Sequence, residues 1–475
     1  MIDTEILRSR ILSLAMRGEL SERSAQDGLA SDLYAQIIET KSKLVKSGNI
    51  RKDKKYEEIE NDNMPYQIPD NWCWVRFGKI INLQSGQDLK PSEYNDHENG
   101  IPYITGASNY GDDGSIIINR WTDYPKAYAY KNDILLSCKG TVGKLTVLQE
   151  KEVHIARQIM GIRTYDVDVG FIFYYLQSMI YGIKEAQKGL IPGIERNDVL
   201  DLLCPLPPLP EQKRIVKKIE ALFCELSQID RLQDQYSSNQ EALKGKLIEA
   251  AIQGKLTEQL PEDGTADALY HSILEEKQLL IKVGKLKKEK SLPEIVEDEI
   301  PFEIPENWRW VRISDVIDVR DGTHDSPKYH DEGIPLVTSK NISSGKLIFD
   351  DVKLISMDDA QKINERSYVD DGDILFAMIG SIGNPVIVHK DREFCIKNVA
   401  LFKNFAPMHI SMDYFYWFLM HEQFVLRKNA IGGLQPFVSL KVFRSHLMPL
   451  PPMSEQIRIA ERLYELEDVV LEQEK

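Results

Sequence analysis

Two glycine-rich loops carry the side chains of this chain that are best suited to contact a ligand. The first reads Lys139-Gly140-Thr141-Val142-Gly143-Lys144, and the second reads Gly380-Ser381-Ile382-Gly383-Asn384. Glycine lets a backbone turn tightly and approach a ligand closely, while lysine, hydroxyl and amide groups donate to phosphate oxygens or base edges. Neither loop has the G-x-x-x-x-G-K-[ST] spacing of a nucleotide P-loop. The loops therefore favour a binding surface over a nucleotide site.

Catalytic motifs are missing from the sequence. Asn384-Pro385-Val386 does not match the N-P-P-[YF] motif of adenine methyltransferases, and there is no G-x-G-x-x-G, G-x-S-x-G or H-E-x-x-H. The acidic run Asp370-Asp371-Gly372-Asp373 resembles a nuclease metal site, but it aligns with the single Asp133 of a similar segment, which favours a turn before a strand. The five cysteines show no metal-ligand spacing. We therefore expect no catalytic residue, metal or cofactor in this chain; methyl transfer by the isolated chain would support the alternative of a self-contained enzyme.

Short apolar segments flank both loops and must position them. Residues 134–138 and 145–148 enclose the first loop, and residues 374–379 and 385–388 enclose the second. This pattern predicts two β-hairpins. An aromatic-rich helix is predicted after each hairpin, over 171–181 and 414–424, with its rings in the core rather than stacked on bases.

The chain is internally duplicated. Met64-Pro65-Tyr66-Gln67-Ile68-Pro69-Asp70-Asn71-Trp72-Cys73-Trp74-Val75-Arg76 returns as Ile300-Pro301-Phe302-Glu303-Ile304-Pro305-Glu306-Asn307-Trp308-Arg309-Trp310-Val311-Arg312, and the segment 206–212 returns as 450–456. A repeat of this length is a domain-sized unit and not a solenoid turn. Because the copies agree at their borders and differ in their interiors, the pattern indicates one scaffold carrying two different readers.

Helical seams link the copies. Residues 211–256 form one unit whose front half recurs at 455–475 and whose back half recurs at 1–20. Heptad steps predict a coiled-coil seam, and the pseudo-twofold relation of the copies predicts that the helices pair in antiparallel fashion. The seam residues are Ile215, Ile219, Leu222, Leu226, Ile229, Ile459, Leu463, Leu466 and Val470.

Composition argues against a secreted or membrane-spanning protein but does not decide whether the chain binds nucleic acid. The 475 residues have a hydrophobic fraction of 42%, which is enough for ordinary cores, and a net charge of −15. No secretory signal is recognisable and no apolar run is long enough to cross a bilayer, so we expect a cytoplasmic protein without a membrane partner. The acidity argues against nucleic acid at first sight. Most of it lies outside 76–205 and 312–449, however, and charge alone leaves this question open.

Taken together, these motifs resemble the specificity subunit of type I restriction-modification enzymes. The resemblance rests on Ile-Pro-x-Asn-Trp-x-Trp-Val-Arg, on Pro-Leu-Pro-Pro-Leu-x-Glu-Gln and on Gly-Asp-Ile-Leu, from which Asn132-Asp133 departs. It implies an α+β fold with two tandem, pseudo-twofold-related target-recognition domains that are mixed but rich in β-strands, joined by long antiparallel coiled-coil helices. The expected divisions are an N-terminal helical block at 1–60, recognition domains at 61–210 and 297–454, a central helical region at 211–296 and a C-terminal helix at 455–475.

The resemblance also implies a non-catalytic, sequence-specific DNA-binding subunit that reads an asymmetric bipartite target in double-stranded DNA. Expected partners are two modification (methyltransferase) subunits, which use S-adenosylmethionine to methylate adenine N6, and two restriction (translocase) subunits, which use ATP and Mg. A coiled-coil adaptor with two ligand-binding domains is the alternative. The residues that we expect to contact DNA are Ser108, Asn109, Lys139, Thr141, Lys144, Gln158 and Lys188 in the first copy and Lys340, Asn341, Ser381, Asn384, Asn398 and Gln435 in the second.

Overall fold

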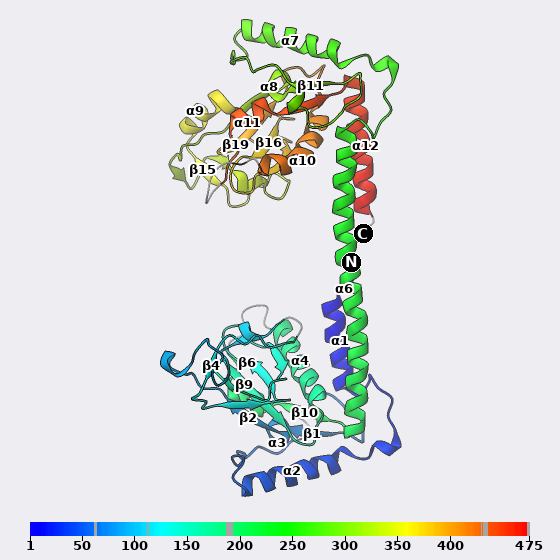
Figure 1. Cartoon of the computed structure of the whole chain (residues 1–475), viewed down its shortest axis with the longest axis vertical. Helices are drawn as coiled ribbons and strands as arrows, with labels where there is room; N and C mark the ends of the chain where they lie inside the picture. Colours follow the sequence, from blue (N-terminus) through cyan, green and yellow to red (C-terminus); the bar gives the residue numbers. More distant parts are fainter. Residues whose placement is uncertain (61–63, 112–113, 187–192, 429, 431–435, 473–475) are drawn as a thin grey trace. The chain divides into compact units, whose positions relative to one another are not determined.

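The computed structural model describes residues 1–60, 64–111, 114–186, 193–428, 430 and 436–472 (Figure 1). Two compact units divide the chain, unit 1 over Met1–Asp234 and unit 2 over Gln235–Lys475. The division falls inside the longest helix, α6 (Leu209–Ile252), and therefore inside the predicted central helical region.

Unit 1 contains a four-stranded antiparallel sheet in the order β2-β9-β6-β7, formed by β2 (Ile81–Ser85), β9 (Ile159–Thr164), β6 (Ile134–Ser137) and β7 (Leu145–Val147). A second sheet has the order β4-β3-β8-β5, formed by β4 (Trp121–Thr122), β3 (Ile101–Ile104), β8 (Glu152–Ile155) and β5 (Tyr128–Tyr130). Strands β1 (Cys73–Arg76) and β10 (Leu203–Leu206) pair at the border. The helices are α1 (Thr4–Met16), α2 (Ala30–Lys46), α3 (Phe77–Ile80), α4 (Val169–Ala186), α5 (Arg196–Leu200) and the first part of α6.

Unit 2 repeats the first sheet as β12-β19-β16-β17, formed by β12 (Asp318–Asp321), β19 (Val399–Lys403), β16 (Ile374–Ala377) and β17 (Gly383–Ile387). Its other sheet is β13-β15-β14-β18, from β13 (Tyr329–His330), β15 (Lys353–Ile355), β14 (Ile334–Val337) and β18 (Cys395–Ile396), and β11 (Arg309–Arg312) pairs with β20 (Leu447–Leu450). The helices besides α6 are α7 (Ala266–Lys282), α8 (Ile313–Val316), α9 (Met357–Ser367), α10 (Met412–Lys428), α11 (Leu440–Ser445) and α12 (Met453–Glu472). The predicted α+β fold, with two tandem mixed domains and long helices, is confirmed.

Both predicted hairpins are present, as β6–β7 and β16–β17. The turn before each hairpin needs a left-handed residue, and Asn132 (φ 71°) replaces Gly372 (φ 79°) there. Asparagine tolerates this conformation, which explains the departure from Gly-Asp. Asp133 and Asp373 each accept a hydrogen bond from a backbone N–H three residues earlier. The acidic run therefore belongs to a turn, as predicted.

The aromatic helices supply core side chains, also as predicted. In α4, Phe171 and Tyr175 are almost completely buried, and in α10 Tyr414, Phe415 and Trp417 are. The Tyr175 hydroxyl donates to Leu203 O (3.0 Å), which fastens α4 to β10. Burial of such rings accounts for much of the apolar area that stabilises each unit.

The two repeated border motifs meet in space and form one joint in each unit. Trp72 Nε1 donates to Glu211 Oε2 (3.0 Å), and Trp308 Nε1 donates to Glu455 Oε2 (2.8 Å). Gly18 (φ 74°) lies against Pro69 in unit 1, and Gly254 (φ 71°) lies against Pro305 in unit 2. A Cβ on either glycine would lie only 2.5 Å or 2.4 Å, respectively, from the proline Cγ. The motifs are repeated because each is one half of this contact.

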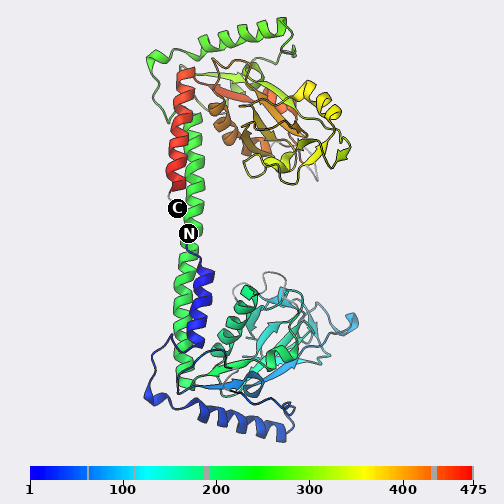
Figure 2. The ribbon, with the colours of Figure 1, turned by 180° about the vertical axis from the view of Figure 1, so that it is seen from behind.

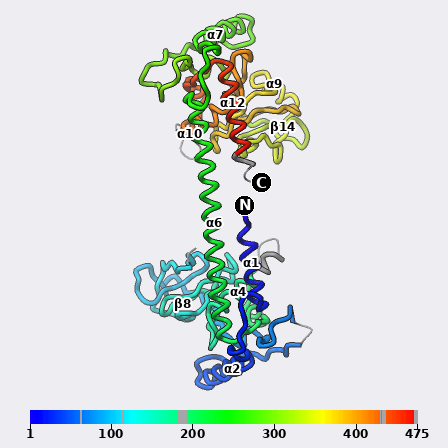
Figure 3. Tube along the Cα trace, turned by 90° about the vertical axis from the view of Figure 1, so that its right-hand side faces the viewer, coloured from blue at the N-terminus to red at the C-terminus, as the bar shows by residue number. Residues whose placement is uncertain are grey.

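Antiparallel helix pairs form inside each unit. The predicted orientation is observed, but the partners differ from the predicted pair of seams, because Ile215 and Ile219 pack with Leu12 of α1, and Ile459 and Leu463 pack with Ile248 of α6. In unit 1, α1 runs against α6, with Arg8 Nη2 2.9 Å from Asp230 Oδ2 and Arg214 Nη2 3.1 Å from Glu22 O (Figures 1 and 3). In unit 2, α12 runs against the second part of α6 (Figure 2). There Lys244 pairs with Glu467, and Gln259 Nε2 lies 2.8 Å from Glu455 Oε1.

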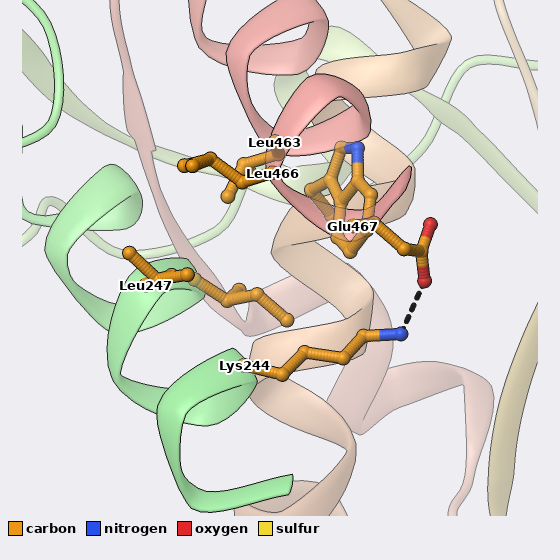
Figure 4. A pocket seen from close by; sticks show the side chains of 7 residues that line it. Lys244, Leu247, Leu463, Leu466 and Glu467 are labelled. Carbon is orange, nitrogen blue, oxygen red and sulfur yellow. Dashed lines mark hydrogen bonds and ion pairs between the residues drawn. The ribbon is translucent and has the colours of Figure 1, made fainter. Parts of the chain in front are cut away.

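The seam residues differ in burial. Ile215, Ile219, Leu226, Ile459 and Leu463 are buried, whereas Leu222, Ile229 and Leu466 are half-buried. Leu463 and Leu466 face Leu247, beside the Lys244–Glu467 ion pair (Figure 4). The Val470 side chain lies outside the described residues.

Candidate nucleic-acid interface

Two loops cross closely in unit 1 at the end of the four-stranded sheet. The segment after β2 passes over the segment before β9, with hydrogen bonds from Gly86 N to Ile159 O (3.0 Å) and from Gln87 N to Ile155 O (2.9 Å). A Cβ on Gly86 would lie 2.0 Å from Ala156 O, so only glycine permits this approach. We call residues 86–88 and 156–158 the unit 1 crossing.

Unit 2 contains the same arrangement. Gly322 N donates to Val399 O (3.0 Å) and Thr323 N to Ile396 O (3.0 Å), and a Cβ on Gly322 would lie 2.3 Å from Ile396 O. We call residues 322–324 and 396–398 the unit 2 crossing. The correspondence makes Gln158 and Asn398, two of the predicted DNA contacts, structural equivalents.

The hairpin loop joins the unit 1 crossing. Cys138 N donates to Gln158 O (2.8 Å), and Lys139 follows directly. Ser137 Oγ donates to Thr141 O (2.7 Å) and accepts from Lys144 N (2.8 Å), which holds the loop in shape. Lys139, Thr141, Lys144 and Gln158 are all exposed, and burial raises the pKa of the Cys138 thiol beneath them. The structure thus brings four of the predicted side chains to one surface.

Asn109 and Asn341 have a different role from the predicted one. Both are buried, at 1% and 8% exposure. Asn109 Oδ1 accepts from Thr105 N (2.9 Å) while its Nδ2 donates to Ile117 O (2.8 Å), and Asn341 bonds Thr338 N (2.9 Å) and Ile348 O (3.1 Å) in the same way. The predicted direct contact is therefore corrected, because these amides brace their loops and have no face toward an outside ligand.

The remaining predicted contacts lie on different elements, with Asn384 in β17 and Ser108 and Lys340 each in a short 3-10 helix. Ser108, Lys340 and Ser381 are exposed, whereas Asn384 and Asn398 are half-buried. Asn384 N donates to Gln423 Oε1 (3.1 Å), and the Asn398 carbonyl accepts from Ser339 Oγ (3.4 Å). Lys188 and Gln435 lie outside the described residues.

Three residues at the crossings were missed by sequence reasoning. Arg157 and Lys397 each lie one residue before the predicted amide, and His324 contacts Asn398 directly. In both copies a basic residue is followed by an amide, at Arg157-Gln158 and Lys397-Asn398. A comparison of the two interiors could have found Arg157 and Lys397 from this shared pair.

Cationic side chains at the unit 1 surface differ in their pairing. Arg157 Nε lies 2.7 Å from Asp88 Oδ2, whereas Lys139 and Lys144 form no ion pair with another described residue. Such lysines are free to meet phosphate oxygens. No three His, Cys, Asp or Glu side chains among the described residues are grouped as metal ligands. None of the described helices is long and apolar enough to span a membrane.

Comparison with known proteins shows which family the chain resembles in sequence and in fold. The family model described as type I restriction modification DNA specificity domain matches residues 69–234 and 305–475. The EcoAI specificity subunit of Escherichia coli is 26% identical, covering 97% of this chain and 88% of its own length. The MjaVIII specificity subunit of Methanocaldococcus jannaschii is 24% identical over 85% of this chain and 88% of its own length. A solved type I R-M system structure covers 86% of this chain and 93% of its own with a TM-score of 0.59 at 19% identity, which supports the fold.

Proposed function

The chain belongs to the type I restriction-modification specificity subunit family, and we propose that it reads an asymmetric bipartite sequence in double-stranded DNA. Each unit would read one half of the target. The chain itself would supply no catalytic group. It would recruit two modification subunits, which use S-adenosylmethionine, and two restriction subunits, which use ATP and Mg.

The observation that carries this proposal is the contrast between shared joints and different crossings. Each unit places polar side chains at a crossing beside the corresponding four-stranded sheet, exposed at Gln158 and His324 and half-buried at Asn398. The side chains at corresponding positions differ, with Asp88 and Gln158 in unit 1 and His324 and Asn398 in unit 2. Equivalent positions with different hydrogen-bonding groups favour two half-sites of different sequence, because base edges in the major groove are distinguished by their donors and acceptors.

The charge distribution agrees with a binding mode that depends on local contacts. A chain with a net charge of −15 lacks a general attraction for DNA. Lys139 and Lys144 supply positive charge at the crossing surface, and Gln158 supplies an amide for a base edge. Basic partner subunits would add to the affinity of the assembled complex.

Exposed apolar side chains on the helices support recruitment of partners. Ile6 and Leu14 on α1 are 49% and 40% exposed, and Ile457 and Val469 on α12 are 42% and 56% exposed. Apolar side chains that remain exposed on such helices are suited to protein contacts. We propose that the modification subunits bind these helices.

Methylation mapping tests the proposal. The full chain would be assembled with the modification subunits of its own system and S-adenosylmethionine, and methylated adenines would be located by sequencing. We expect one bipartite motif, and we expect exchange of residues 76–205 for those of another specificity subunit to change one half only.

The charge contribution is tested by Lys139→Ala combined with Lys144→Ala, with the exposed Lys131→Ala as the matched control. Each lysine that neutralises a phosphate makes the slope of log affinity against log salt concentration steeper by about 0.9. The slope of the double variant should therefore be shallower by up to about 2. Methylation without sequence preference would contradict the proposal. Unchanged salt dependence in the double variant, together with protein binding, would favour the adaptor.

A further inference from the structure

His324 lies between two groups that both accept hydrogen bonds. Its Nε2 is 2.9 Å from Asp321 Oδ2, and its Nδ1 is 2.9 Å from Asn398 Oδ1. Asp321 is 4% exposed and also pairs with Arg366 on α9. The carboxylate is therefore fixed from both sides, while the imidazole is 58% exposed at the unit 2 surface.

Two hydrogen-bonding arrangements of His324 and Asn398 are possible, one for the neutral imidazole and one for the imidazolium. An ionised carboxylate only accepts, so the ring nitrogen facing Asp321 must carry a proton. A neutral imidazole then has a bare Nδ1, which needs a donor, and the Asn398 amide must turn its NH2 group toward it. An imidazolium donates from both nitrogens, and the amide must then turn its oxygen inward.

The Asn398 backbone is held while its amide turns. Asn398 N donates to Thr323 O (3.1 Å), its carbonyl accepts from Ser339 Oγ (3.4 Å), and its φ is 56°. Both contacts come from the loops that form the unit 2 crossing and its neighbour. The side-chain amide is therefore the part of this residue that can exchange its donor and acceptor edges.

We propose that His324 is a positioning residue that determines specificity, because its protonation sets which edge of the Asn398 amide faces DNA. This inference rests on the proposed function, and it names the group that reads one position of the unit 2 half-site. With neutral His324 the outward edge carries the amide oxygen, which favours a base with a major-groove amino group, adenine or cytosine. With imidazolium the outward NH2 favours an acceptor edge, guanine or thymine.

Charged groups around His324 come from each neighbouring element. Asp321 lies on β12, Arg366 on α9, and Lys397 beside Asn398 donates to Ser326 Oγ. Lys340 follows Ser339 on the adjoining loop. The three cations Arg366, Lys397 and Lys340 are groups that can attract DNA phosphates.

Unit 1 offers an internal control. Asp88 stands two residues after Gly86, as His324 stands two residues after Gly322. Asp88 pairs with Arg157 (2.7 Å between Oδ2 and Nε), and no histidine contact to Gln158 is present among the described residues. The reading of the unit 1 half-site should therefore not follow this switch.

The experiment selects DNA at two pH values. The full chain, assembled with its modification subunits, is incubated with a randomised duplex library at about pH 5.5 and about pH 8, between which histidine changes charge. Ionic strength is held constant, and the bound DNA is sequenced. We expect the base preference at one position of one half-site to change by about fivefold or more, from guanine or thymine at low pH to adenine or cytosine at high pH.

Variants distinguish the mechanism from other pH effects. His324→Gln and His324→Phe should each make that preference independent of pH, while the exposed His330→Gln should behave as the wild type. Identical base preferences at both pH values, or a pH effect that persists in both His324 variants, would overturn the inference. Failure to enrich any sequence at either pH would instead count against the proposed function.

Discussion

Replacing the buried glutamate of each joint by glutamine should destabilise unit 2 more than unit 1. Both carboxylates are completely buried. Glu455 Oε2 accepts from Trp308 Nε1 (2.8 Å), and its Oε1 accepts from Gln259 Nε2 (2.8 Å) and Thr257 Oγ1 (3.1 Å). Glu211 Oε2 accepts from Trp72 Nε1 (3.0 Å) and Asn71 Nδ2 (3.1 Å), but its Oε1 has no hydrogen-bond partner among the described residues.

The magnitude follows from these partners. A hydrogen bond to a charged group contributes about 1.5–3 kcal/mol, against about 0.5–1.5 kcal/mol for a neutral pair. Glu455→Gln weakens the tryptophan contact and turns an NH2 group toward two donors, so we expect a loss of about 3 kcal/mol in the free energy of opening. Glu211→Gln weakens contacts at one oxygen only and removes a charge whose other oxygen is unsatisfied, so we expect about 1 kcal/mol.

Hydrogen–deuterium exchange of the full chain measures both joints at once. Peptides covering β11 and β1 report the two units separately, and a difference of about 2 kcal/mol corresponds to roughly a thirtyfold difference in local opening. Each variant serves as the control for the other, because the unmutated joint should keep its protection. Equal losses at the two joints, or a larger loss for Glu211→Gln, would refute the assignment of stability to the second carboxylate oxygen.

Two further changes probe other parts of the molecule. Asn109→Ala and Asn341→Ala should each cost about 2 kcal/mol in local stability, because backbone groups lose a buried partner, and each should weaken reading of a single half-site in methylation mapping. A loss shared by both half-sites would contradict the bracing role. Burial raises the pKa of Glu422, but hydrogen bonds from His421 and His446 outweigh it and lower the pKa from 4.5 to about 2. A depressed carboxylate pKa contributes stability above about pH 4.5 that is lost as the pH falls toward about 2. The midpoint temperature of thermal unfolding should therefore fall less steeply with decreasing pH in Glu422→Gln than in the wild type or in the exposed Glu461→Gln. Parallel curves for all three proteins would exclude this contribution.

The borders of the fold were predictable because they are repeated, but their contact was not. Trp72 and Glu211 each appear in a motif with an equivalent in the second copy, which identifies two repeated positions in the scaffold. The hydrogen bond between them joins residues that are 139 positions apart. Sequence spacing carries no information on such a pairing, since it depends on how β1 and the start of α6 come together.

The candidate site was predictable in its loops and not in its individual side chains. Asn109 and Lys139 are both polar residues in segments that contain glycine, and sequence composition does not distinguish them. One amide is buried under its own loop and the lysine is exposed, a difference created by tertiary packing. The same limit applies at Asn398, whose role depends on His324, 74 residues earlier in the chain.

Structural equivalence of the crossings changes how the two interiors should be compared. Gly86 and Gly322 align at an offset of 236 residues, as the N-terminal blocks do, whereas Gln158 and Asn398 align at 240 because the inserted segments between them differ in length, with α9 in unit 2. Each crossing nevertheless keeps two backbone hydrogen bonds of the same kind, although their acceptors are four residues apart in unit 1 (Ile155 and Ile159) and three apart in unit 2 (Ile396 and Val399). Insertions are therefore accommodated between the crossing segments, while the crossing geometry is retained. If the crossings read DNA as proposed, replacing one or two side chains there would change the preferred bases without any change in the joints or helix pairs that assemble each unit.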